Sequence, residues 1–159
     1  MSHELHPSIL EHLGLVAAVR SHCDEVDRRG DIHVRFDPVR PPGQIGPEAA
    51  LCLYRVVQEG VRNASKHSGA ALVRVTLESS PESADLTILD DGCGFDPEAR
   101  TSGGLGLVSM TERVRALGGE FCVTSKPGEG TRLHVRLPTH RQEGGPIRDR
   151  SSTQEISHA

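Results

Sequence analysis

Apolar side chains in the first part of the chain recur every three or four residues. This spacing covers residues 8–29, and Pro7 stands where a helix can begin, so we expect one helix that ends near Gly30. Between residues 32 and 36 apolar and polar positions alternate, which is the period of a half-buried strand. We expect this strand to end where Pro38 opens a proline-rich loop.

A second helical pattern predicts a helix from Pro47 to about His67. One face of this helix is polar and carries Glu59, Asn63 and Lys66, opposite an apolar stripe. Two strand-like runs follow at residues 72–77 and 86–89, joined by a turn-forming segment. They predict a hairpin that places Asp90 at the end of a strand.

The remaining pattern predicts one more helix and one more hairpin. Residues 107–117 are helical in spacing and are followed by two glycines, and strand-like runs at 120–125 and 131–137 flank a glycine-rich turn. Beyond Pro138 the chain has too little apolar surface to offset its ordering entropy. We therefore expect three parts: residues 1–30 with the first helix, residues 31–138 as a folded domain, and residues 139–159 as a disordered tail.

Composition excludes several classes of function. The chain of 159 residues has a net charge of −4, one Tyr, three Phe and no Trp, so it offers neither a basic footprint nor a stacking platform for nucleic acid. Its four cysteines are too widely separated for a zinc motif or a disulfide framework. No apolar run has the length of a membrane span. We expect a cytoplasmic chain with no membrane segment.

The polar face of the second helix is a candidate site. A polar stripe on an arbitrary helix usually faces water. Here the same stripe continues toward the N-terminus as Val56 and Cys52, so it changes from apolar to polar as the wall of a ligand pocket does. Magnesium takes oxygen ligands and usually only one or two from the protein, and Asn63 can supply one.

A second candidate follows directly on a predicted strand, in the segment Asp90-Asp-Gly92-Cys-Gly94. The simplest interpretation is a tight turn. Alternatively, the two glycines let the backbone approach a planar ligand, and a carboxylate at the end of a buried strand needs a donor such as an adenine amine. Asp90 is our choice for that carboxylate, and Asp91 is the competing candidate.

The third candidate is the glycine-rich segment Gly103-Gly104-Leu105-Gly106-Leu107, which precedes a predicted helix. Backbone N–H groups without helical partners, together with the helix dipole, favour a phosphate at such a position. The segment matches neither a Rossmann fingerprint nor a P-loop. Alone, this segment is weak evidence for a phosphate site. The evidence is strengthened by the order of the three segments along the chain and by the short gap between them.

These three segments, in this order, resemble the GHKL ATPase superfamily and, within it, the ATP-binding domain of bacterial sensor histidine kinases. The resemblance implies an α+β fold: a two-layer α/β sandwich of the Bergerat type, with helices on one face of a mixed, mostly antiparallel sheet. It also implies ATP and Mg²⁺ as ligands. Asn63 would coordinate the metal, with Glu59 as a catalytic group or a further metal ligand. Lys66 would assist transfer, and Lys66 and His67 would approach the phosphates.

The resemblance assigns the remaining contacts to ATP as well. Asp90 would recognise adenine, and Gly92 and Gly94 would make room for the base. Residues 95–103 would form a lid over the nucleotide. The phosphates would be contacted by Gly104, Leu105, Gly106 and Leu107. Thr131, in a segment that resembles the family's last glycine box, would also contact the nucleotide.

Two stretches resemble one subclass, the nitrate-sensor class of histidine kinases. Residues 5–19 look like the second helix of its dimerisation domain, and residues 104–119 resemble its glycine-rich helix. The acceptor of that class is a histidine followed by an acidic residue, whereas here His6 precedes proline and His12 precedes leucine. We therefore expect residues 1–30 to be a remnant of a dimerisation helix, without the phosphoacceptor helix.

The partners implied are a response regulator, a histidine-containing dimerisation domain on another chain or segment, and a second copy through the N-terminal helix. Two other functions are alternatives. One is an anti-sigma-like switch that binds or phosphorylates a partner at serine. The other is a nucleotide-sensing module without catalytic activity.

Overall fold

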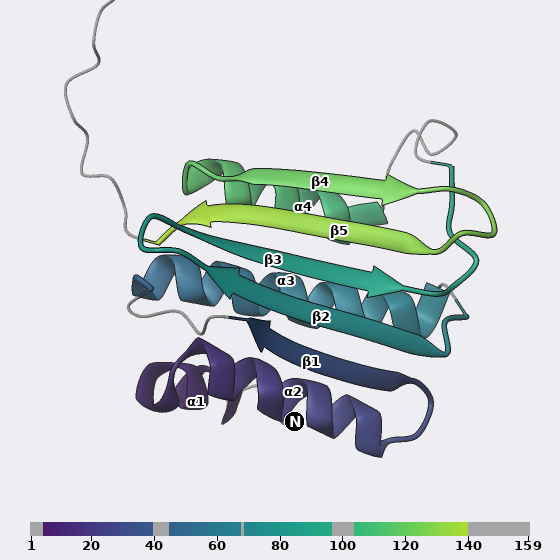
Figure 1. Cartoon of the computed structure of the whole chain (residues 1–159), viewed down its shortest axis with the longest axis horizontal. Coiled ribbons are helices and arrows are strands. Elements are labelled where there is room, and N and C mark those ends of the chain that lie inside the picture. The colour runs from purple at the N-terminus through teal and green to yellow at the C-terminus, as the bar shows by residue number, and fades with distance from the viewer. Residues whose placement is uncertain (1–4, 40–44, 68, 97–103, 140–159) are drawn as a thin grey trace, which may run out of the picture.

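The protein is a two-layer α+β sandwich in a computed structural model that describes residues 5–39, 45–67, 69–96 and 104–139 (Figure 1). The elements, in chain order, are α1 (Leu5–Leu13), α2 (Leu15–Arg28), β1 (His33–Val39), α3 (Pro47–His67), β2 (Leu72–Ser79), β3 (Ser83–Asp90), α4 (Gly104–Ala116), β4 (Glu120–Ser125) and β5 (Thr131–Pro138). Within these residues, no helix combines the length and the apolar character needed to cross a membrane.

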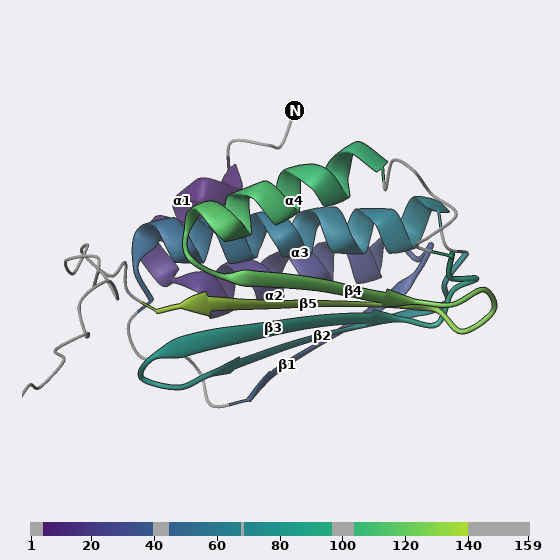
Figure 2. The ribbon, with the colours of Figure 1, turned by 90° about the horizontal axis from the view of Figure 1, so that it is seen from above.

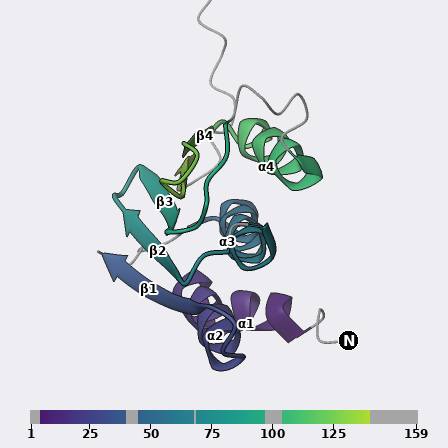
Figure 3. The same ribbon diagram turned by 90° about the vertical axis from the view of Figure 1, so that its right-hand side faces the viewer.

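The five strands form one sheet in the order β1-β2-β3-β5-β4. β1 runs parallel to β2, and the other neighbouring pairs are antiparallel. Figures 2 and 3 show the helices together on one face of this sheet, with α3 in the middle of the helical layer. The predicted fold class, a mixed and mostly antiparallel sheet with helices on one face, is confirmed.

The core lies between the helices and the inner face of the sheet. Val73 and Leu77 of β2 and Leu53 of α3 are all 0% exposed. α3 comes so close to the sheet at Gly60 that a Cβ atom there would stand 2.6 Å from Cδ1 of Ile88. Because burial of apolar surface is the main favourable term in folding, this packing fixes the position of α3 on the sheet.

The single helix predicted over residues 8–29 is wrong, because Gly14 interrupts it. Gly14 has a φ of 89°, in the left-handed region that glycine adopts without a steric penalty. Its N–H donates to the Leu10 carbonyl at 3.2 Å, and its own carbonyl accepts from Ala18 N–H at 3.1 Å. The chain thus ends α1 and begins α2 at the same residue, and helical spacing on both sides concealed the break.

The strand predicted to end at Pro38 continues to Val39. Pro38 pairs in register with Leu77 of β2. β1 is one of the two edge strands of the sheet, with β2 as its neighbour. Proline is tolerated at an edge because its missing N–H can point away from the ladder.

Candidate functional site

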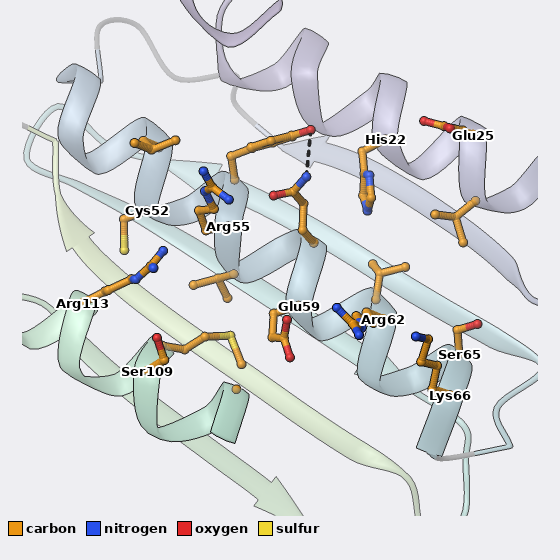
Figure 4. Close-up of a pocket in the computed structure, with 18 of the residues that line it drawn as sticks. His22, Glu25, Cys52, Arg55, Glu59, Arg62, Ser65, Lys66, Ser109 and Arg113 are labelled. Atoms are coloured by element: carbon orange, nitrogen blue, oxygen red, sulfur yellow. Dashed lines mark hydrogen bonds between the residues drawn. The ribbon is translucent and has the colours of Figure 1, made fainter. Parts of the chain in front are cut away.

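A cavity of about 770 Å³ runs along α3 and is lined by α2, α3 and α4 (Figure 4). Cys52 and Val56 line it at the N-terminal side, and Glu59 and Lys66 line it further along the helix. This order is the change from apolar to polar that the sequence predicted for a pocket wall. The cavity also extends across α3 to His22 and Glu25 of α2.

Glu59 lies against the first turn of α4. A Cβ atom at Gly106 would meet Oε1 of Glu59 and would stand 2.9 Å from its Cδ atom. The absence of a side chain at Gly106 therefore leaves the space that the Glu59 carboxylate occupies. This contact joins the first and the third candidate segments, which are far apart in the sequence.

The opposite wall of the cavity comes from α4. Ser109 and Arg113 of this helix face the groove, with Ser109 nearer to Glu59 and Arg113 beside Cys52 (Figure 4). Neither residue was predicted from the sequence. Their helical spacing from Gly106 is a signal that could have indicated a shared face with it.

The other predicted residues of α3 lie nearer its C-terminal end. Asn63 is half-buried, one turn after Glu59, and Lys66 and His67 are exposed. Asn63 is absent from the described residues that line the cavity. No group of three or more His, Cys, Asp or Glu side chains in the described ranges is arranged to hold a metal ion.

Asp90 is half-buried at the end of β3, on the side of the sheet that faces the helices. Burial raises the pKa of its carboxyl group, against the backbone N–H groups of Gly92 and Thr131, which lower it; the neighbouring charge of Asp91 raises it further. The Gly92 N–H donates to Oδ1 of Asp90 at 2.9 Å. Because burial of a charged carboxylate is costly, a further hydrogen-bond donor would stabilise the ionised form of Asp90.

Asp91 has a different environment from Asp90. It is exposed, and its Oδ1 accepts the backbone N–H groups of Ala71 at 2.8 Å and Leu72 at 3.0 Å. Hydrogen bonds from Leu72 and Ala71 lower the pKa of the Asp91 carboxyl group, with the Leu72 bond as the largest cause. Asp91 therefore ties the loop after β3 to the beginning of β2.

The loop after β3 packs against the turn between β4 and β5. Gly94 has a φ of 63°, and a Cβ atom there would meet the carbonyl of Lys126 and stand 2.9 Å from the carbonyl oxygen of Gly130. Gly130 in turn packs directly on the carbonyl of Asp90. The room that Gly94 leaves is thus filled by protein backbone, and Gly92 is itself buried. Thr131 follows at the start of β5 and is the register partner of Asp90.

The glycine-rich segment is helical rather than a loop before a helix. α4 begins at Gly104, three residues earlier than predicted, so Gly104, Leu105 and Gly106 form its first turn. The predicted start of the helix was too late because glycine is a poor helix former, so the glycines of the first turn did not indicate a helix. The first-turn N–H groups still have no partner within the helix. The side chain of Leu105 and most of the predicted lid, residues 97–103, lie outside the described residues.

Residues 48–141 match the family of histidine kinase-, DNA gyrase B- and HSP90-like ATPases. The chain is 30% identical over 141 residues to the signal transduction histidine-protein kinase/phosphatase DegS of Brevibacillus brevis, which covers 89% of this chain. It is 36% identical over 137 residues to the sensor histidine kinase ComP of Bacillus subtilis, covering 85% of this chain. These alignments span 36% and 18% of the two relatives, so the chain corresponds to a minor part of each.

Solved structures of histidine kinases share the fold. The histidine kinase domain of a blue-light activated kinase from Erythrobacter litoralis superposes with a TM-score of 0.62 at 28% identity, over 80% of this chain and 60% of that one. The mycobacterial sensor histidine kinase MprB superposes with a TM-score of 0.59 at 29% identity, over 77% of this chain and 93% of that one.

Proposed function

Because the chain belongs to the family of histidine kinase-, DNA gyrase B- and HSP90-like ATPases, we propose that it is the ATP-binding catalytic domain of a two-component sensor histidine kinase. Two of its relatives are, by name, a signal transduction histidine-protein kinase/phosphatase and a sensor histidine kinase. The observation that carries the proposal furthest is the contact between Glu59 of α3 and Gly106 of α4. It brings an acidic side chain to the end of a helix that favours phosphate.

In this proposal Asp90 binds the adenine end of ATP. Its half-buried carboxylate accepts backbone N–H groups from Gly92 and Thr131, and its two oxygens have capacity for a further donor, which the exocyclic amine of adenine supplies. Asp91 is less suited to this role, because it is exposed and its Oδ1 is bonded to the backbone at the beginning of β2, whereas Asp90 is half-buried on the side of the helices. Gly94 contributes closely packed backbone and Gly92 contributes buried backbone beside the base, and Thr131 stands opposite Asp90.

The phosphate end of the proposed site lies between α3 and α4. The first turn of α4, from Gly104 to Leu107, presents backbone N–H groups that favour an anion. Lys66 and His67, both exposed at the end of α3, add positive charge or hydrogen bonds on the same side. In this proposal Glu59 would orient or deprotonate the group that attacks the γ-phosphate.

Magnesium fits this arrangement through few protein ligands. Asn63 would hold the ion through its carboxamide oxygen, with Glu59 as an alternative ligand one turn away on α3. Magnesium usually takes one or two protein oxygens and fills its other positions with water and nucleotide phosphates. When bound, magnesium neutralises charge on the transferring phosphoryl group.

The phosphoryl acceptor in this proposal is a histidine on another chain or on another segment. Residues 1–30 would belong to a dimerisation helix, residues 31–138 to the catalytic domain and residues 139–159 to a tail. A response regulator and a histidine-containing dimerisation domain are the proposed partners, and the N-terminal helices offer a surface for a second copy. The stretch from Gly104 to Gly119 supports the nitrate-sensor class, and the proposed location is cytoplasmic.

The experiment that tests the function mixes the purified chain with labelled ATP, magnesium and a separately expressed dimerisation domain that carries an acceptor histidine. We expect acid-labile, base-stable phosphate on the added domain. Acid-stable phosphate on a serine of a partner would identify an anti-sigma-like switch instead. Nucleotide binding without transfer to any acceptor domain would identify a sensing module.

A further inference from the structure

Ser125 is a buried hydroxyl at the end of β4, next to the adenine end of the proposed site. It is 8% exposed, and Thr139 is the only other buried polar side chain in the described part of the chain. We propose that Ser125 is a positioning residue, which fixes the loop after β3 onto the turn between β4 and β5 and so holds the adenine end of the site in shape. The inference rests on the proposed function and adds to it a residue that the three candidate segments do not contain.

The hydrogen bonds of Ser125 connect two segments that are distant in the sequence. The backbone N–H of Phe95, in the loop after β3, donates to Ser125 Oγ at 2.9 Å. Ser125 Oγ donates to the Gly130 carbonyl at 3.0 Å and lies 3.0 Å from Thr131 Oγ1. The loop and the turn are therefore bonded to the same oxygen atom.

The capacity of a hydroxyl group fixes the direction of the third hydrogen bond. A serine hydroxyl has one proton and two lone pairs. The proton is used on the Gly130 carbonyl, and one lone pair accepts from Phe95. The remaining lone pair accepts from the Thr131 hydroxyl, which then turns its own lone pairs away from Ser125. Thr131 is in register with Asp90. The hydroxyl of Ser125 therefore sets the orientation of the Thr131 hydroxyl beside the Asp90 carboxylate.

Backbone contacts between the same two segments are close enough to transmit a change at Ser125. The Gly128 N–H donates to the Cys93 carbonyl at 2.6 Å. Gly94 packs on the Lys126 carbonyl, and Gly130 packs on the Asp90 carbonyl. Loss of the Ser125 hydroxyl would remove the hydrogen bonds that the half-buried Phe95 N–H and the buried Gly130 carbonyl make to this oxygen, so the loop would shift.

The test compares Ser125→Thr with Ser125→Val, because threonine and valine have nearly the same shape and differ in the hydroxyl. Affinity is measured with fluorescent ATP and GTP analogues, and folding is followed by chemical denaturation. We expect Ser125→Thr to keep wild-type affinity for the ATP analogue and Ser125→Val to lose about tenfold. The loss should be larger for the ATP analogue than for the GTP analogue, so that the preference for adenine falls. A purely structural role would weaken both nucleotides equally.

Equal affinities for Ser125→Thr and Ser125→Val would overturn the inference, whether both variants bind normally or both bind weakly. Failure of the wild-type chain to bind either nucleotide would overturn the proposed function, and this inference with it. Hydrogen exchange of the free wild-type protein gives a second measurement that does not depend on the variants. The Phe95 amide should be protected, because it is bonded to a buried hydroxyl, and rapid exchange at Phe95 would contradict the inference.

Discussion

The two adjacent carboxylates at the end of β3 differ in their response to pH. Burial raises the pKa of Asp90, whereas hydrogen bonds from Leu72 and Ala71 lower the pKa of Asp91. For Asp90, the contribution to stability is fully present below its unfolded pKa and is lost as pH rises through its folded pKa. For Asp91, the contribution is present above its unfolded pKa and is lost as pH falls through its folded pKa.

This difference predicts the pH dependence of nucleotide affinity. The charged form of Asp90 accepts the adenine amine, so affinity for an ATP analogue should fall as pH falls through the raised pKa of Asp90, above the range of an ordinary Asp near ~3.8. Asp90→Asn should weaken binding and abolish this acidic decline, and Asp91→Asn is the matched control that should keep it. Titration of affinity against pH measures the effect. A decline that disappears in Asp91→Asn and persists in Asp90→Asn would reverse the assignment.

Gly106→Ala tests the contact between α4 and Glu59. The new methyl group would push the Glu59 carboxylate away, and a flexible side chain can move at little cost to folding. Alanine also favours a helix by up to about 1 kcal/mol over glycine, so the free energy of unfolding should change little. Phosphoryl transfer to a supplied acceptor domain should fall at least about tenfold.

Chemical denaturation provides the control for Gly106→Ala, because unfolding would lower transfer for a trivial reason. A stable Gly106→Ala variant with wild-type transfer would show that the position of Glu59 does not matter. A double variant, Gly106→Ala with Glu59→Ala, could instead regain the transfer rate that Gly106→Ala alone has lost. This result would exclude Glu59 as a catalytic group.

α3 is the element on which the site depends, because it carries Glu59 and Asn63 on one side and packs on the sheet with the other. It approaches the sheet closely at Gly60, against Ile88 and Leu133. The same helix therefore links the packing of the core to the position of the proposed phosphate end. A shift of α3 away from the sheet would move both polar side chains together.

Gly60→Ala should destabilise the fold. The added Cβ atom would stand 2.6 Å from Cδ1 of Ile88 and 3.2 Å from Cδ1 of Leu133. Such overpacking costs about 1–3 kcal/mol, partly offset by the better helix propensity of alanine. Ile88→Val removes the nearer methyl group, so the double variant should lose less than the sum of the single variants. Additive losses in the free energy of unfolding would contradict this packing.

The local sequence pattern was sufficient to predict the boundaries of some helices and strands and insufficient for others. The boundaries of α3 follow from Pro47, from its periodic apolar face and from the polar segment beyond it, and they were predicted as observed. The break at Gly14 was missed because α1 and α2 have the same spacing. Pro38 stopped the predicted β1 too early, because an edge position cannot be recognised without the strand order.

At the scale of the whole molecule, the candidate site is built from segments that the fold brings together. Sequence spacing selected Glu59 and Gly106 separately, since each lies in a motif of its own. It had no signal for their mutual contact, or for Ser125, because these depend on how α4 packs against α3 and how β5 inserts between β3 and β4. Local spacing identifies residue types for a chemistry, whereas tertiary packing decides which of them meet.

The chain by itself should not acquire phosphohistidine when incubated with ATP and magnesium. His6 is followed by proline and His12 by leucine, so neither has an acidic neighbour to assist deprotonation of the imidazole. Mass spectrometry under conditions that preserve phosphohistidine measures this. Acid-labile phosphate at His6 or His12 would show that the N-terminal helices supply their own acceptor.

The central claim is that the chain binds ATP together with magnesium, and a titration with a fluorescent ATP analogue tests it most directly. We expect saturable binding that strengthens when magnesium is added. In Asn63→Ala the magnesium-dependent part should be lost while the fold is kept, because Asn63 lies outside the buried core. Arg115→Ala, exposed on α4, is the control and should bind as the wild type does. The absence of saturation at millimolar nucleotide, with or without magnesium, would contradict the account.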